Sequence, residues 1–219
     1  MSDLEDVLTA SKSVEGLRGK FHAHLSLCTK ESGLKSCEEF CRAQRVKLTV
    51  IDLESSSGHT QTDVMTTSHY RDEEAGAVPR ILRQLSMLAK KANSAGFSVQ
   101  RIKLEHESLP SLPQFDVEHY HEVHIKLKIA KHTFAAAKQR LQELGAEYGF
   151  VASRNPRQVT EDFVYQFANM RIYEGTLEAA DEHICTIQTA LAENGFDIEQ
   201  VKRETVLLDT AYEMDSWWT

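Results

Sequence analysis

The feature that most constrains the fold of this chain is a pair of matching segments about a hundred residues apart. The run Phe-His-Ala-His-Leu-Ser-Leu at residues 21–27 is matched by Tyr-His-Glu-Val-His-Ile-Lys-Leu at residues 120–127. A helix-like stretch that ends in Gly-Phe also occurs twice, with its glycine at Gly96 and at Gly195. An internal repeat of this kind predicts two similar lobes, and a function is expected at the surface between them.

The composition fits a globular protein with two compact lobes. The chain has 219 residues, of which 41% are hydrophobic and 26% are charged, enough apolar material for a buried core. The formal net charge of −8 argues against nucleic acid and anionic membranes as partners. The four cysteines are scattered and no apolar run reaches membrane-spanning length, so we expect a cytoplasmic location. A small-molecule ligand is expected in the space between the lobes.

Hydrophobic periodicity and turn residues predict the same order of elements in both copies: strand, helix, strand, strand, helix, strand. The first copy is predicted to contain strands at 20–28, 47–53, 62–70 and 97–105, with helices at 36–45 and from Pro79 to Gly96. The second copy is predicted to contain strands near 117–129, 147–153, 162–173 and 196–208, with helices near 133–144 and 176–194.

This order predicts the α+β class, as tandem duplicated ferredoxin-like (βαββαβ) lobes whose antiparallel sheets are covered by helices on one face. A Pro-rich segment between the copies is typical of a linker. The predicted boundaries are an N-terminal arm at 1–18, a first lobe at 19–108, a linker at 109–115, a second lobe at 116–209 and a C-terminal tail at 210–219.

Two histidines at matching positions are the leading candidates for catalysis. Alternation along the first strand places Phe21 on the helix-covered face and His22 and His24 on the opposite face. His124 holds the position of His24 in the second copy. Because the first strand of this topology is central in its sheet, we expect His24 and His124 to meet in one cleft and to divide the roles of base and acid.

Five further side chains are predicted to bind a ligand on the same faces, where hydroxyl and cationic groups are suited to phosphate oxyanions. These are Ser26 and His69 in the first copy, and Lys126, Arg171 and Tyr173 in the second.

The pattern resembles the 2H phosphoesterase superfamily, in which each of two lobes contributes a strand that carries His-x-Thr or His-x-Ser. His24-Leu25-Ser26 matches this motif. The second copy reads His124-Ile125-Lys126, so a lysine stands where the family has a hydroxyl. The resemblance implies a small phosphorylated or nucleotide ligand, on which the two histidines act as acid and base.

Two other functions stay open. His22 and His24, together with Glu122, are a possible ligand set for a divalent transition metal, the only cofactor that the sequence suggests. The second alternative is a non-catalytic module that binds a ligand or another protein. The adjacent Trp217 and Trp218 at the C-terminus are typical interface anchors, for a partner or for a second copy of the chain.

Overall fold

The architecture comes from a computed structural model, which describes residues 16–28, 33–54, 60–74, 76–107, 120–173 and 177–211. The predicted linker at 109–115, most of the predicted arm and the Trp217-Trp218 tail lie outside these residues. The boundaries predicted for two lobes therefore stay a prediction. No helix in the described ranges combines the length and the apolar character needed to cross a membrane.

The two halves have the same order of strands and α-helices. The first half consists of β1 (Gly19–Cys28), α2 (Gly33–Gln44), β2 (Lys47–Glu54), β3 (Thr60–Asp72), α3 (Ala77–Ser94) and β4 (Ser98–Glu107). The second half consists of β5 (Tyr120–Ala130), the 3₁₀ turn η2 (Lys131–Thr133), α4 (Phe134–Tyr148), β6 (Val151–Arg154), β7 (Phe163–Ile172), α5 (Leu177–Glu193) and β8 (Asp197–Asp209).

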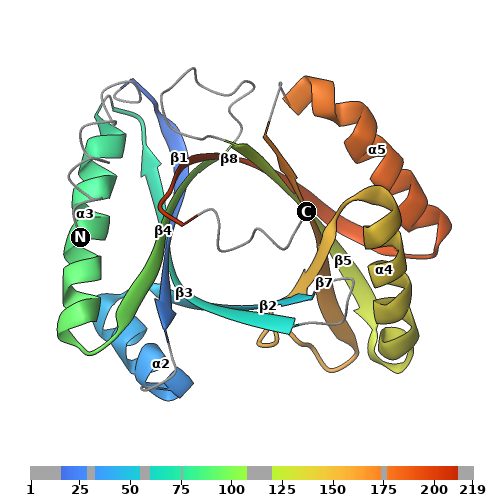
Figure 1. Ribbon diagram of the computed structural model, residues 1–219, viewed down its shortest axis with the longest axis horizontal. Helices are drawn as coiled ribbons and strands as arrows, with labels where there is room; N and C mark the ends of the chain where they lie inside the picture. Colours follow the sequence, from blue (N-terminus) through green and yellow to red (C-terminus); the bar gives the residue numbers. More distant parts are fainter. Residues whose placement is uncertain are drawn as a thin grey trace.

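The prediction of two separate sheets, each open and covered on one face, is wrong. The eight strands of the described residues form one closed antiparallel barrel in the order β1-β3-β2-β6-β7-β5-β8-β4. Figure 1 shows the ring of strands, with α2 and α3 outside it on one side and α4 and α5 outside it on the other.

The barrel closes because the edge strands of each half pair with those of the other half. In one seam, residues 52–54 of β2 pair with residues 152–154 of β6. In the other, residues 103–107 of β4 pair with residues 204–209 of β8, with a bulge after Leu104. An exposed sheet edge presents unpaired N–H and C=O groups, and closure satisfies them.

Apolar side chains that point outward from the barrel pack under the helices. Phe21, Ala23 and Leu25 of β1 pack with residues of α3, such as Ile81 and Leu85. The corresponding residues of β5, including Val123 and Ile125, pack with α4 and α5. The apolar core therefore lies outside the ring of strands, and the alternate residues of each strand, many of them polar, face its interior.

One predicted helix end is also wrong. The helix predicted near 133–144 was expected to end at Gly145, but α4 continues to Tyr148, and Gly149, with φ 74°, takes the C-cap position. Gly145 lies within the helix, where a Cβ atom would approach the carbonyl oxygen of Phe150 to 2.6 Å. The glycine thus allows a close approach of two backbone segments, which its position in the sequence did not distinguish from a cap.

Candidate functional site

A cavity of about 290 Å³ lies inside the barrel. Twelve of the side chains that line it come from β1, β4, β5 and β8, which are neighbours in the barrel. Eight of these twelve are linked to one another by ion-pair contacts. We call this set the charged cluster: His22, His24, Lys103, Glu105, Glu122, His124, Lys202 and Glu204.

The other side of the cavity is partly apolar. It is lined by Ile51 and Leu53 of β2, Met65 of β3 and Phe167 of β7, which we call the apolar patch. In the order of the strands, β2 and its neighbours lie across the barrel from β4 and β8. The cavity therefore has a charged side and a partly apolar side that face each other.

His24 is held by contacts at both ring nitrogens. Its Nδ1 lies 3.1 Å from Thr67 Oγ1 on β3, and its Nε2 lies 3.3 Å from Glu105 Oε2 on β4. The first distance is an ordinary hydrogen bond, whereas the second is long for a hydrogen bond to a charged group. Thr67 therefore fixes the ring more firmly than Glu105 does.

His124 has the same arrangement in the second half. Its Nδ1 lies 2.8 Å from Asn169 Oδ1, while Asn169 Nδ2 donates to Val151 O and to Ser153 Oγ, each at 2.9 Å. The amide is thus oriented with its oxygen toward the ring, so His124 Nδ1 carries the proton. The Nε2 atom lies 3.4 Å from Glu122 Oε2 and 3.5 Å from Glu204 Oε2.

These neighbours favour the charged form of His124. Burial opposes a charge on the ring, but the carboxylates of Glu122 and Glu204 and the bond to Asn169 outweigh it, so the pKa of His124 is raised above its ordinary value. The Nε2 atom of His124 therefore faces two carboxylates, which stabilise the charged form of the ring relative to an isolated imidazole.

A chain of ion pairs joins the two histidines. Lys103 Nζ lies 2.6 Å from Glu105 Oε1 and 2.5 Å from Glu122 Oε2, and these two carboxylates contact His24 and His124 respectively. Burial opposes their ionisation, but Lys103 and the neighbouring histidines, joined at Glu122 by Arg171, outweigh it, and the pKa of each carboxyl lies well below its ordinary value. The pKa of Lys103 is raised because the attraction of the same carboxylates outweighs burial.

Four of the five side chains predicted to bind a ligand line the cavity, and three of them have acidic partners. Ser26 Oγ donates to Asp63 Oδ2 at 3.1 Å. Lys126 pairs with Glu199 and lies over the ring of Tyr165. Arg171 Nε donates to Glu122 Oε1 at 2.9 Å.

The other two lie at the margin of the site or beyond it. His69 lines the cavity from an exposed position, with its ring edge-on to that of His22 at 4.6 Å. Burial, followed by the neighbouring His22 and Lys202, lowers the pKa of His69. Tyr173 does not line the cavity, because β7 ends at Ile172 and Tyr173 follows it, about half exposed, with its ring against Tyr120.

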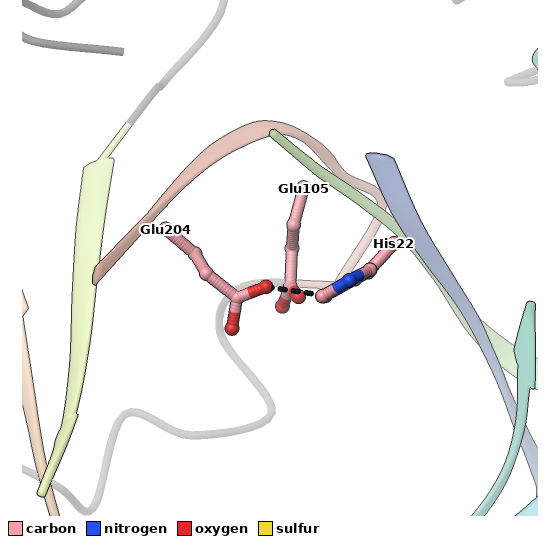
Figure 2. A group of neighbouring side chains, drawn as sticks. All are labelled: His22, Glu105 and Glu204. Atoms are coloured by element: carbon pink, nitrogen blue, oxygen red, sulfur yellow. Dashed lines mark hydrogen bonds and ion pairs between the residues drawn. The ribbon is translucent and has the colours of Figure 1, made fainter. Parts of the chain in front are cut away.

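The predicted metal ligands are grouped differently in the structure. His22 lies with Glu105 and Glu204, and within the described ranges this is the set of three whose candidate ligand atoms all lie within 4.8 Å of one another. Figure 2 shows these side chains converging from three strands. His24 and Glu122, the other two predicted ligands, belong to the chain of ion pairs instead.

The sequence-based prediction missed Glu105 and Glu204 as site residues, together with Lys103 and Lys202. A signal for them was present, because each lysine and glutamate pair has the same spacing and follows the repeated glycine at a similar distance. The repeat alone does not assign these residues to a site, and only closure of the barrel places them inside.

No protein-family model and no curated protein matches the chain. Several solved structures resemble it weakly, including the following three. A heme-binding protein from Thermus thermophilus is 11% identical, with a TM-score of 0.29, and the match covers 92% of this chain and 96% of that one. A proposed monooxygenase from Fusobacterium nucleatum is 9% identical, with a TM-score of 0.31 and coverage of 89% and 94%. Chlorite dismutase from Candidatus Nitrospira defluvii is 10% identical, with a TM-score of 0.28 and coverage of 95% and 99%. Likeness at this level carries no functional argument.

Proposed function

We propose that the chain binds a small amphipathic molecule inside the barrel and that His24 and His124 exchange protons with its polar end. The observation that carries this proposal is the charged cluster facing the apolar patch across one cavity. A ligand with one polar and one apolar end satisfies both sides at once. A wholly apolar ligand would leave the charged groups without new partners.

The size of the cavity limits the ligand. At about 290 Å³ the cavity is near the lower end of the volumes found for small-molecule sites, about 300 to 1,000 Å³. Its apolar side offers Ile51, Leu53, Met65 and Phe167 to the body of the ligand. The ligand is therefore a small metabolite with a compact apolar part rather than a polymer.

The contacts of the two rings support a role in proton transfer. Each Nδ1 has a partner within 3.1 Å that fixes the ring, whereas each Nε2 lies 3.3 to 3.5 Å from its carboxylates. A polar group of a ligand can replace these longer contacts without freeing the ring. His124, whose charged form is favoured, is the proposed acid, and His24 is the proposed base.

A phosphoester reaction is the second candidate, supported by the two matched histidines that line one cavity. The side chains proposed to hold phosphate are less suited to it, because Ser26 is bonded to Asp63, Lys126 to Glu199 and Arg171 to Glu122. A phosphate dianion would have to compete with these carboxylates for the same donors. A neutral or singly charged polar group fits the charged cluster better.

The test is to fill the cavity and measure ligand retention. Met65 lines the apolar patch, whereas Met87 on α3 is 60% exposed, so Met65→Trp and Met87→Trp form a matched pair. Small molecules that remain bound to the purified protein are extracted and identified by mass spectrometry, and a fragment library is screened by ligand-observed NMR. We expect the wild type and Met87→Trp to retain the same compounds. Met65→Trp should bind them with an affinity at least about tenfold lower.

Equal retention by Met65→Trp, or the absence of any bound compound or fragment in the wild type, would contradict the proposal. Once a ligand is known, His24→Gln and His124→Gln separate catalysis from binding, because both are expected to bind it while losing turnover. The same variants are then assayed with cyclic nucleotides and other phosphodiesters. Turnover of a phosphodiester that both substitutions abolish would favour the second candidate.

A further inference from the structure

His22, Glu105 and Glu204 form a compact group of metal-ligand atoms on adjacent strands. They come from β1, β4 and β8, and each residue is at most 7% exposed. Figure 2 shows the imidazole and the two carboxylates directed toward a common region. Buried side chains of this kind cannot easily reorient, so the group is already organised before any ion binds.

The partners of His22 favour a lone pair on Nδ1. Lys202 Nζ, which can only donate, lies 2.7 Å from His22 Nδ1, and Nε2 lies 3.1 Å from Glu107 Oε1, which can accept its proton. A histidine that binds a metal typically donates its other N–H to a carboxylate in this way. In the opposite tautomer Nδ1 would donate to Glu204 Oε1 at 2.6 Å, but Nε2 would face the Glu107 carboxylate without a proton.

With the proton on Nε2, two hydrogen-bond acceptors, one on His22 and one on Glu204, lie next to each other. His22 Nδ1 and Glu204 Oε1 are 2.6 Å apart, and a lone pair and a carboxylate at that distance need a positive charge beside them. Lys202 Nζ supplies it, at 2.7 Å from the nitrogen and 2.8 Å from the oxygen. The ammonium group thus marks a place where the surrounding atoms favour a cation.

We propose that His22, Glu105 and Glu204 bind a divalent transition-metal cation, which takes the place of the Lys202 ammonium group. One imidazole nitrogen with two carboxylate oxygens suits zinc, manganese, iron(II) or cobalt(II) better than calcium or magnesium, which prefer all-oxygen sites. Three protein ligands also leave at least one coordination position open toward the cavity. The site does not depend on the amphipathic ligand proposed above.

The place related to this site by the repeat, beside Glu122, explains why only one such site is expected. There Lys103 of β4 bridges Glu105 and Glu122, and its side chain is 12% exposed, against 32% for Lys202. Lys202 has room to swing away when a metal binds, whereas Lys103 is enclosed between two carboxylates. The ammonium group of Lys202 beside His22 is therefore the one that a metal ion can replace.

The test is a titration of the untagged full chain, after removal of metals, with cobalt(II) followed by absorption spectroscopy and with zinc(II) in competition. We expect one cobalt(II) per chain. Glu204→Gln and His22→Gln should weaken binding about 100-fold, and Glu107→Gln about tenfold. Lys202→Met removes the competing ammonium group and should strengthen binding about tenfold. His132→Gln, at an exposed position on η2, is the matched control and should bind as the wild type does.

Thermal unfolding with chelator present shows whether each variant is folded. If a ligand variant does not fold, the gain of affinity in Lys202→Met still tests the site. Binding that survives His22→Gln in a folded protein would overturn the proposal. So would the absence of stoichiometric binding to both the wild type and Lys202→Met. A loss of metal binding would leave ligand retention in the Met65→Trp and Met87→Trp comparison unaffected, so the two proposals fail separately.

Discussion

The two halves of the barrel place an imidazole at the same position but surround it with different charges. In the first half His24 contacts Thr67 and Glu105, and in the second His124 contacts Asn169 and Glu204. Two residues before these histidines, the same strand carries His22 in the first half and Glu122 in the second. Strand geometry thus sets where each ring lies, and the neighbouring side chains determine its charge.

Because His22 stands where the other half has Glu122, the two lysines have different partners. Lys103 bridges two carboxylates, Glu105 and Glu122, whereas Lys202 bridges a carboxylate and an imidazole. The first is a well-compensated buried charge, while the second is a cation that another cation can replace. The comparison predicts that the half with Glu122 contributes more to stability and the half with His22 more to ligand or metal binding.

The largest expected effect separates these two positions directly. Glu122→Gln should lower the free energy of unfolding by about 3 kcal/mol, because Lys103 and Arg171 lose their shared carboxylate inside the barrel. His22→Gln should cost about 1 kcal/mol, the value of an ordinary hydrogen bond. Urea unfolding at neutral pH with chelator present measures both. Equal costs would show that the two halves do not differ in this way.

The pH dependence of the same variant gives the sign of the Glu122 contribution. Because Lys103, Arg171 and His124 outweigh burial, the pKa of Glu122 is well below its ordinary value. Its contribution is present above the ordinary carboxyl pKa of about 4.3 and is lost as the pH falls through the lower folded value. The advantage of the wild type over Glu122→Gln should therefore shrink as the pH falls below the ordinary carboxyl pKa. An advantage that grows toward low pH would contradict the ion-pair assignment.

Substitutions of the residues that orient the two imidazole rings should lower the free energy of unfolding by amounts that differ less. Asn169 bonds to His124, Val151 and Ser153, so Asn169→Leu leaves several buried polar groups without partners and should cost about 2 kcal/mol. Thr67→Val, the counterpart beside His24, should cost about 1 kcal/mol. Chemical unfolding of the two variants under identical conditions tests the order. A larger cost for Thr67→Val would show that the first ring is the more firmly held.

The smallest effect is expected at the seam between the halves. Arg154 Nε on β6 lies 3.1 Å from Asp52 Oδ2 on β2, with a third of the arginine side chain exposed. Arg154→Met should change the free energy of unfolding by about 0.5 kcal/mol, as for other partly exposed ion pairs. A loss of several times this value would mean that the seam depends on a charge and not on its backbone ladder. Denaturant unfolding measures this change in the free energy of unfolding, with Arg140→Met on α4 as a surface control.

The sequence predicts the faces of the strands well, for a physical reason. Side chains alternate along a strand, so Phe21 and His22 must point to opposite sides, and the apolar set marks the side that packs under the helices. The same rule brings His24 and His124 to the side away from the helices. That side is the interior of the barrel, where both residues line the cavity.

Closure of the barrel was not predictable from the same pattern. The seam between residues 52–54 and 152–154 is made by backbone hydrogen bonds, which leave no trace in side-chain periodicity. An open sheet and a closed barrel share the same alternation, and only closure converts Lys103 and Glu105 from surface charges into buried ones. The charged cluster is therefore a consequence of closure that the sequence-based prediction missed.

The measurement that tests the central claim most directly is NMR titration of the ¹⁵N-labelled imidazoles of His24 and His124 in the wild type and in Lys103→Met. The claim is that one connected network of charges joins both rings inside one barrel. Lys103 belongs to the first half but neutralises Glu105 beside His24 and Glu122 beside His124. Without it, Glu122 should draw more strongly on His124, so the titration midpoint of His124 should rise. A midpoint for His124 that does not respond to Lys103→Met would contradict the account.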